Sequence, residues 1–274
     1  MNCRNLNLAL ATLILTLSGA QAEEESSIPF ADGAFTISET DSMERVLSYN
    51  GTEIVRGYFL DYDRIVEIGT VEAALFQVGA GGNACGPRTV IAWKPEDEEL
   101  KTALAGDDCG SPSPAITDSA IYFVPYLLPG TSAEVQVWTP DEGLTLAGTL
   151  SYTPQPGTSW DSLNIDDLAY PVDAFSNEAV YKMAQTLLGN KLVDVATGLS
   201  VTDGFHKLAS GIAYASGCVP HACGSADAFM AIDKANRKLY FAQQDGNGGV
   251  EAWPALSEWP EDVRKAMQET IEKN

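Results

Sequence analysis

The stretch best suited to chemistry is a six-residue loop with a cysteine at each end. It reads Cys218-Val219-Pro220-His221-Ala222-Cys223 and lies between two β-prone runs, 211–217 and 224–233. The flanking glycines at 217 and 224 supply the backbone freedom that a tight excursion from a sheet requires. If the two cysteines are bonded, the loop becomes a small ring that loses little entropy when a partner binds it. The sequence therefore predicts a stiff histidine loop suited to insertion into another protein's cleft.

Two other interpretations of this loop remain open at this point. The spacing C-x-x-H-x-C supplies three potential metal ligands, which are too few for a structural zinc without a fourth ligand from elsewhere. In an exported chain, a disulfide between Cys218 and Cys223 is favoured over a metal site. The second alternative is a surface histidine on a closed turn that contacts no partner.

The rest of the sequence does not complete a catalytic site. His206 is the only other histidine, and no G-x-S-x-G nucleophile motif occurs. The glycine-rich run 79–86 lacks the lysine and the following helix of a phosphate-binding loop. The aspartate pairs at 61 and 63 and at 107 and 108 could act as a general acid and base or bind calcium. The favoured interpretation is that each pair lies in a solvated acidic turn. We expect no enzymatic activity, no cofactor and no metal.

The first 22 residues have the features of a secretory signal peptide. Arg4 precedes an apolar run, Leu6 to Leu17, and Ala20-Gln21-Ala22 is a small-x-small cleavage site. Cleavage after Ala22 would remove Cys3, and no later stretch has the roughly 18 apolar residues that a membrane span requires. We therefore expect a mature protein that is periplasmic or secreted and does not insert into a membrane.

The chain is strongly acidic. Loss of Arg4 leaves 15 of the 16 basic residues with all 38 acidic ones, a net charge of −23 on the mature chain. Such a surface repels nucleic acid and anionic membranes, and it attracts basic proteins. The alternative explanation is that the acidity serves only solubility.

Four cysteines remain after the predicted cleavage, which in an oxidising compartment indicates two disulfides. Proximity and the domain division favour Cys85–Cys109 and Cys218–Cys223. Loop-closure entropy gives about 3.5 kcal/mol for the first bond and about 2 kcal/mol for the second. The shorter ring therefore contributes more to shape than to stability.

Residues 23–152 predict an all-β domain, sandwich-like or barrel-like. Asn50-Gly51 between two β-prone runs predicts a hairpin with a type I′ turn. Further short strands are expected at 64–68, 73–78, 88–93, 121–125, 134–138 and 144–152, with a short helix within 95–104. Exposed tryptophans at 93, 138 and 160 would suit carbohydrate binding, although core packing explains tryptophans equally well. The role of this domain stays open.

Residues 153–160 are rich in Pro, Gly, Ser and Thr and are predicted to form a linker. Residues 161–274 predict an α+β domain, a small antiparallel sheet flanked by helices. We expect one helix from about 177 to 188, capped by Ser176, and a last helix opened by Pro260. Short strands are expected between them, including 192–196 and 199–205.

The loop and its surroundings resemble the Ivy family, periplasmic proteinaceous inhibitors of vertebrate (c-type) lysozyme. The resemblance covers roughly residues 165–274, and the family's loop usually reads C-K-P-H-D-C-G. This chain matches that pattern at Cys218, Pro220, His221, Cys223 and Gly224. It departs at Val219, where lysine is usual, and at Ala222, where aspartate is usual.

The resemblance implies an Ivy-like fold for residues 161–274 and a protein partner. His221 would lie in the active-site cleft of a muramidase, either a c-type lysozyme or one of the cell's own lytic transglycosylases. A protonated imidazole can donate from both ring nitrogens to the two carboxylates of such a cleft. The alternative function is a periplasmic binding or scaffold protein that keeps the fold without inhibition. The two changed loop positions and the extra N-terminal domain favour that alternative.

Overall fold

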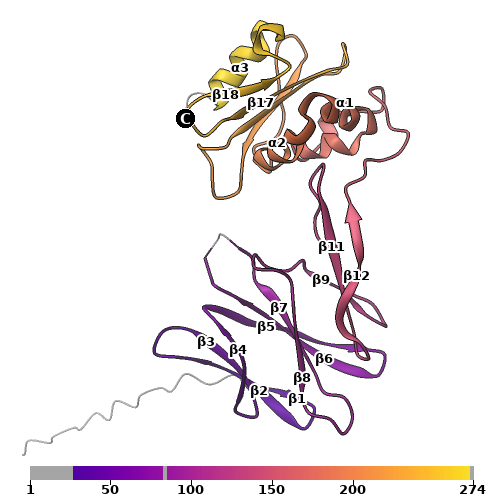
Figure 1. Ribbon diagram of the computed structural model, residues 1–274, viewed down its shortest axis with the longest axis vertical. Coiled ribbons are helices and arrows are strands. Elements are labelled where there is room, and N and C mark those ends of the chain that lie inside the picture. The colour runs from indigo at the N-terminus through magenta and orange to yellow at the C-terminus, as the bar shows by residue number, and fades with distance from the viewer. Residues whose placement is uncertain (1–26, 83–84, 272–274) are drawn as a thin grey trace, which may run out of the picture.

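The computed structural model describes residues 27–82 and 85–271 of the 274-residue chain. The fold is mostly β, with antiparallel sheets and few helices, and it is divided between an N-terminal and a C-terminal part (Figure 1). The predicted signal peptide, residues 1–22, lies outside the described residues. Within the described ranges, no helix is both long and apolar enough to cross a membrane.

The N-terminal part contains three antiparallel sheets of four strands each in its described residues. The first sheet holds β1 (Ser27–Phe30), β2 (Gly33–Glu39), β3 (Arg45–Tyr49) and β4 (Thr52–Gly57). The second holds β5 (Phe59–Ile68), β6 (Val71–Gly79), β7 (Arg88–Trp93) and β8 (Lys101–Ala105). The third has the order β12-β11-β10-β9, from β9 (Pro114–Ile116), β10 (Ile121–Phe123), β11 (Ser132–Thr139) and β12 (Gly143–Ser151).

The second sheet is the middle layer and is buried on both faces. Phe76 points to the first sheet and packs on Phe35, with ring centroids 4.9 Å apart. Leu75, one residue earlier, points the other way and joins a cluster with Trp138 of the third sheet. Successive side chains of a strand point to opposite faces, so a strand buried on both faces reads as a continuous apolar run. This burial explains the sequences Ala73–Phe76 and Val90–Trp93.

The predicted hairpin at Asn50-Gly51 is confirmed. Tyr49 pairs with Thr52 across the turn, and both turn residues have positive φ, 48° and 79°. The short helix expected within 95–104 is wrong. Residues 101–105 form β8, which pairs with β7 so that Ala105 lies opposite Thr89 and is fully buried. The acidic residues before β8 belong to the turn that leads into it.

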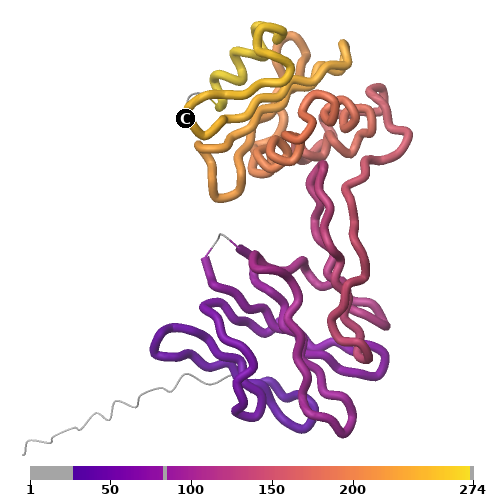
Figure 2. Tube along the Cα trace, viewed as in Figure 1, coloured from indigo at the N-terminus to yellow at the C-terminus, as the bar shows by residue number. Residues whose placement is uncertain are grey.

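The C-terminal part combines a sheet with helices. Its strands are β13 (Val201–Thr202), β14 (His206–Lys207), β15 (Ala213–Cys218), β16 (Ala228–Asp233), β17 (Lys238–Gln244) and β18 (Val250–Trp253). Its α-helices are α1 (Glu178–Leu188), α2 (Leu192–Gly198) and α3 (Glu261–Ile271), accompanied by short 3-10 turns at Ile165–Asp167, Pro171–Ser176, Gly189–Lys191 and Leu256–Glu258. The chain path through both parts can be followed in Figure 2.

Helices cover both faces of this sheet. Met230 and Phe241 face α1 and α2, whereas Phe229 and Tyr240 face α3. All six residues of β16 are buried, which makes it the best-anchored strand of the sheet. Alternate residues therefore supply two separate cores, as period-2 alternation requires.

Two details of the predicted elements need correction. The residue that caps α1 is Asn177, whose side chain accepts hydrogen bonds from the N–H groups of residues 179 and 180, rather than Ser176. The strand expected at 192–196 is wrong, because these residues form α2. Leu192, Val195 and Ala196 are buried together, the spacing of one helical face.

The predicted linker, 153–160, contains no helix or long strand, but it is held against the C-terminal part. Thr158 Oγ1 accepts a hydrogen bond from the Glu178 N–H at 2.7 Å, and Asn177 Nδ2 donates to the Ser159 carbonyl at 2.8 Å. Trp160 is buried in the core under α1 and α2. The segment therefore packs as part of the C-terminal core, and the exact domain limits stay a prediction.

The β11–β12 hairpin contacts both parts of the molecule (Figure 1). Near its turn, Trp138 packs among the N-terminal sheets. At the other end, Tyr152 follows β12 directly and lies 5.2 Å from Tyr181 of α1, centroid to centroid. A Cβ at Gly130, just before β11, would lie 3.1 Å from Val193 Cγ2 of α2. The hairpin is thus packed into the C-terminal core at its open end.

This packing has a measurable pH dependence. Burial raises the pKa of the Tyr152 phenol to about 12, so the folded state resists its ionisation. The stabilisation is complete below the ordinary tyrosine pKa near 10 and is lost as the pH rises towards 12. We expect Tyr152→Phe to reduce the alkaline loss of stability, measured by urea unfolding from pH 8 to about 11.

Tyr170→Phe is the matched control, because the Tyr170 side chain is exposed. It should leave the alkaline stability profile unchanged. Equal profiles for wild type and Tyr152→Phe would contradict burial of Tyr152 at the end of the hairpin.

Candidate functional site: a disulfide-closed histidine loop

The two disulfides join the pairs that the sequence predicts. Cys85 is bonded to Cys109 with a Cα–Cα distance of 4.6 Å, and Cys218 is bonded to Cys223 at 4.9 Å. The second bond closes the loop between β15 and β16. Because both sulfurs are consumed, the C-x-x-H-x-C pattern has no thiolates to offer a metal. Within the described ranges, no group of three or more His, Cys, Asp and Glu side chains is placed to hold a metal ion.

The tip of the loop is a tight turn that presents His221. The Ala222 N–H donates to the Val219 carbonyl at 3.0 Å, so Pro220 and His221 are the two central residues of a β-turn. His221 has φ +64°, as the third residue of a type II turn requires, and Pro220 fits the second position. A non-glycine residue at positive φ persists when its surroundings hold it there. The ring and the proline together provide that restraint.

The two histidines have opposite surroundings. His206 Nε2 lies 3.0 Å from Asp203 Oδ2, and its ring packs 5.4 Å from that of Tyr214. His221 is exposed and makes no hydrogen bond or ion pair with any described residue. Its two ring nitrogens are therefore free for an external partner, whereas those of His206 are partly committed.

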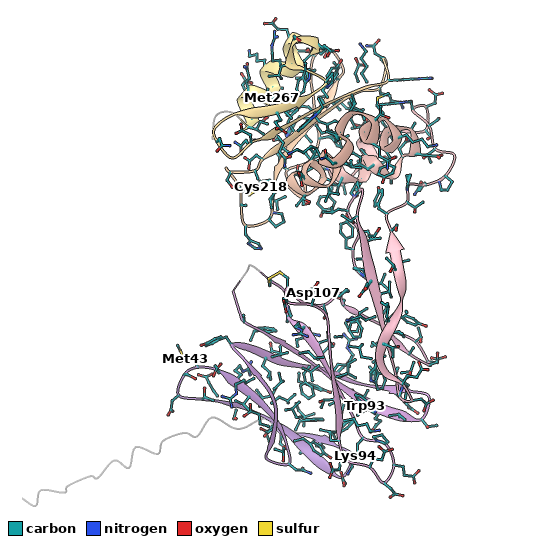
Figure 3. All side chains as sticks on the ribbon, viewed as in Figure 1. Met43, Trp93, Lys94, Asp107, Cys218 and Met267 are labelled. Atoms are coloured by element: carbon teal, nitrogen blue, oxygen red, sulfur yellow. A yellow bond between two sulfur atoms is a disulfide. The ribbon has the colours of Figure 1, made fainter. Side chains whose placement is uncertain are left out.

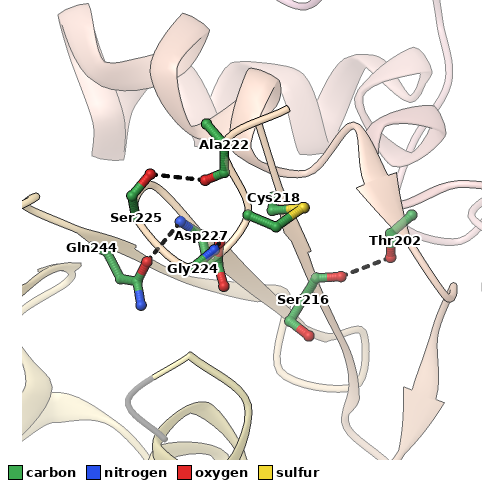
Figure 4. Close-up of a disulfide and its surroundings, with 9 residues drawn as sticks. Thr202, Ser216, Cys218, Ala222, Gly224, Ser225, Asp227 and Gln244 are labelled. Carbon is green, nitrogen blue, oxygen red and sulfur yellow. Dashed lines mark hydrogen bonds between the residues drawn. A yellow bond between two sulfur atoms is a disulfide. The ribbon is translucent and has the colours of Figure 1, made fainter. Parts of the chain in front are cut away.

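A buried carboxylate supports the base of the loop (Figure 4). Asp227 is 6% exposed, and its Oδ1 accepts the Gly224 N–H at 2.7 Å. The Asp227 N–H donates to Gln244 Oε1 at 3.0 Å, and the Gln244 N–H donates to the Asp227 carbonyl at 2.9 Å. Gln244 Nε2 donates in turn to the Ile271 carbonyl at 2.6 Å. The loop is thus connected by hydrogen bonds to β17 and to the end of α3.

The sequence reasoning missed Asp227 and Gln244. Asp227 follows Gly224 by three residues, a spacing at which an Asp side chain can accept a backbone N–H within a turn, and this was the available local signal. Gln244 is 17 residues further along the chain, so only the β16–β17 pairing brings it to the loop.

The two flanking glycines are required for different reasons. Gly224 has φ +88°, a conformation that other residues adopt only with strain. Gly217 is required by close approach, because a Cβ there would lie 2.8 Å from the Val201 carbonyl oxygen. On the same side, Thr202 Oγ1 donates to the Ser216 carbonyl at 2.7 Å, which ties β15 to the edge strand β13.

Two depressions lie at the base of the loop. One, of about 370 Å³, is lined by Val219 and Ala226 together with Lys191 and Asp194 of the α2 region. The other, of about 400 Å³, is lined by Gly224, Ser225 and the glycine-rich turn after β17. Val219 and Ala222 are half-buried, while Pro220 and His221 are exposed. The exposed tip thus carries Pro220 and His221. Val219 and Ala222 lie nearer the base of the loop.

Figure 3 shows Cys218 on the edge of the C-terminal part that faces the N-terminal part, where Asp107 is labelled. Asp107 Oδ1 accepts the Cys109 N–H at 2.8 Å and therefore caps a turn. Asp61 is paired with Arg45 at 2.8 Å, and Asp63 with Arg64 at 2.9 Å. The interpretation as an acidic turn therefore holds for Asp107, but it is wrong for Asp61 and Asp63, which lie within β5 and are held in ion pairs.

Of the two interpretations of the tryptophans, core packing is confirmed and exposure for carbohydrate binding is wrong. The side chains at 93, 138 and 160 are 6%, 0% and 7% exposed. Trp93 and Trp138 pack edge to face in the N-terminal core with centroids 5.2 Å apart. Their burial follows from the layered sheets, which enclose both faces of the middle sheet.

Comparison with known proteins matches two different family models to the two parts of the chain. The family model described as Y4bG N-terminal domain matches residues 31–151, and that described as inhibitor of vertebrate lysozyme (Ivy) matches residues 179–273. The chain is 23% identical over 230 residues, 84% of each chain, to a protein of Sinorhizobium fredii (strain NBRC 101917 / NGR234) described as uncharacterized protein y4bG. No solved structure matches. The resemblance of the C-terminal part to the Ivy family is confirmed.

The support of the loop by Asp227 is testable. We expect Asp227→Ala to lower the free energy of unfolding by about 1–3 kcal/mol, because the Gly224 N–H loses its acceptor. Asp227→Asn, which keeps an acceptor oxygen, should recover part of the loss. Urea unfolding measures both values.

Ser225→Ala is the control, because the exposed Ser225 hydroxyl also bonds within the loop, to the Ala222 carbonyl at 2.9 Å. Its cost should stay below about 0.5 kcal/mol. An Asp227→Ala variant as stable as wild type would show that the buried carboxylate does not hold the loop.

Proposed function

We propose that this protein is an exported inhibitor of c-type lysozyme that inserts the Cys218–Cys223 loop into the active-site cleft. The observation that carries the proposal is His221, an exposed and unengaged imidazole among the described residues, at the tip of a disulfide-closed turn. The turn lies within the segment that matches the family described as inhibitor of vertebrate lysozyme.

The chemistry of the tip suits a glycosidase cleft. Such a cleft holds two carboxylates that flank the scissile bond. A protonated imidazole donates one hydrogen bond from each ring nitrogen, so it can bind both carboxylates and occupy the position of the substrate. Because the turn is already closed by the disulfide and by Pro220, little conformational entropy is lost on insertion. The inhibitor itself needs no catalytic group, and we propose that it is not an enzyme.

The charge of the chain supports a basic partner. The protein has 38 acidic and 16 basic residues, and c-type lysozymes are generally basic. Opposite charges raise the association rate, and this contribution falls as salt screens it. Export to the periplasm, after cleavage following Ala22, would place the protein where a lysozyme reaches it. A lytic transglycosylase of the same cell is the second target to assay.

A second candidate function follows from the loop itself. Val219 and Ala222 stand where the family's loop usually has lysine and aspartate, so two charged contacts with an enzyme are absent. Both side chains are half-buried at the base of the loop. A binding or scaffold protein that keeps the Ivy-like fold without inhibition would tolerate these residues, since nothing would require the charges.

Replacing the histidine tests the proposal directly. We expect mature protein to inhibit lysozyme in a cell-wall lysis assay, and His221→Ala to weaken inhibition by about 10- to 100-fold. That range corresponds to the loss of charge-assisted hydrogen bonds of about 1.5–3 kcal/mol. Inhibition should also weaken as salt concentration increases.

His206→Ala is the matched control, because His206 is engaged with Asp203 and Tyr214 outside the loop. It should inhibit like wild type. Absence of inhibition by micromolar wild-type protein, with the Cys218–Cys223 bond confirmed by mass spectrometry, would reject the lysozyme assignment and favour the scaffold function. Equal inhibition by His221→Ala would reject the insertion mechanism alone.

A further inference from the structure

The N-terminal part contains a groove between its first and second sheets. The groove has a volume of about 540 Å³. One side is supplied by residues of the β3–β4 hairpin, and the other by residues between Lys94 and Thr102. Strands β4 and β8 are the last strands of their sheets, so the groove lies where two sheet edges meet. Its volume lies within the range of about 300–1,000 Å³ that is typical of small-molecule sites.

The bottom of the groove is apolar. Ile54 and Leu100 are half-buried there and pack against the core between the first two sheets. Tyr49 is 8% exposed, and its hydroxyl lies 3.1 Å from the Phe30 carbonyl oxygen and 3.0 Å from Asp32 Oδ1. A surface of this kind can bind the apolar face of a ligand.

The walls of the groove are held in place by contacts within the protein. Lys94 Nζ lies 2.5 Å from each carboxylate oxygen of Asp32, which fixes the lysine and balances its charge. Asn50 Oδ1 accepts the Ala34 N–H at 3.1 Å. Gly33 leaves room for this amide, since a Cβ there would lie 2.3 Å from Asn50 Oδ1. Groups that are already fixed lose little conformational entropy when a ligand binds.

The rim of the groove is polar and exposed. Four of its groups make no hydrogen bond or ion pair with any described residue: Asn50 Nδ2, the hydroxyls of Thr52 and Thr102, and the Glu99 carboxylate. The amide nitrogen donates, the two hydroxyls both donate and accept, and the carboxylate accepts. This mixture suits a ligand whose own groups both donate and accept hydrogen bonds.

The charges of the groove exclude other classes of ligand. Lys94 is paired with Asp32, and Glu53 with Arg56 at 2.6 Å, so Glu99 is the one uncompensated charge among the described lining residues. That carboxylate repels anions such as phosphate. Within the described ranges, no group of three His, Cys, Asp and Glu side chains is placed to hold a metal. A purely apolar ligand would remove the polar rim from water without offering hydrogen bonds, which costs free energy.

We propose that this groove binds an uncharged oligosaccharide. Sugar hydroxyls bond with Thr52, Thr102 and Glu99, while the C–H face of a sugar ring packs on Ile54 and Leu100. The site uses none of the buried tryptophans. Figure 3 labels Lys94 at the end of the N-terminal part that lies away from the C-terminal part, so a bound glycan leaves the histidine loop accessible.

Calorimetric titration of the full mature chain with neutral tetrasaccharides tests this inference. The probes are chitotetraose, an N-acetylated glycan of the cell-wall type, and cellotetraose and maltotetraose, which are glucose chains. We expect saturable binding of at least one probe with a Kd below about 1 mM. Glu99→Ala should raise that Kd at least about tenfold, because a charge-assisted hydrogen bond to the sugar is lost. Binding of chitotetraose would indicate a cell-wall glycan as the source, and binding of a glucose chain another polysaccharide.

Glu98→Ala is the matched control. Glu98 precedes Glu99 in the sequence, but it is paired with Lys101 at 2.6 Å and does not line the groove. This variant should bind the probe as wild type does. Thr102→Ala is the second groove variant in case Glu99→Ala fails to fold, and it should also weaken binding. Circular dichroism verifies the folding of each variant.

Two results would overturn the proposal. Absence of binding of all three probes at millimolar concentration would show that the groove does not take an uncharged oligosaccharide. Equal affinity of wild type, Glu99→Ala and Thr102→Ala would place the glycan site elsewhere. Because none of these measurements involves lysozyme, the proposal stands or falls independently of inhibition.

Discussion

Burial of a sheet on both faces is the constraint on which both parts of this protein depend. In the N-terminal part, β6 and β7 lie between two other sheets, so their side chains fill two cores. In the C-terminal part, β16 and β17 lie between α1 and α2 on one face and α3 on the other. A strand packed on both faces cannot shift its register without moving two cores at once. After the histidine loop, the chain re-enters the sheet at β16, which is such a strand.

The loop therefore combines a fixed base with an exposed tip. At the base, Asp227 and Gln244 bind the loop to β17 and, through the Ile271 carbonyl, to α3. At the tip, the disulfide and Pro220 hold His221 at positive φ. Each restraint removes conformations from the free protein, so the entropy cost falls on folding rather than on association. The body of the domain supplies the order that a short loop would lack by itself.

Features set by local interactions were accessible from the sequence, and those set by distant contacts were not. The Asn50-Gly51 turn, the start of α3 after Pro260 and the cysteine pairs depend on adjacent residues or simple counting. The sequence of α2 favours a strand because seven residues are too few to distinguish the helical from the strand periodicity. The buried tryptophans and Gln244 depend on which sheets meet, and that information is spread over the whole chain.

The β11–β12 hairpin shows why the domain boundary predicted from the sequence differs from the boundary between the two packed cores. Leu128 and Tyr152 belong to the predicted N-terminal domain, residues 23–152, but pack against the core under α1 and α2. Trp138 and Leu144, in the same hairpin, pack with the N-terminal sheets. A two-stranded ribbon that is packed at both ends fixes the relative position of the two parts better than a flexible linker does, because its backbone hydrogen bonds resist bending. The hairpin therefore sets the direction in which the histidine loop points relative to the N-terminal sheets, and the edge of that same hairpin is left uncharged.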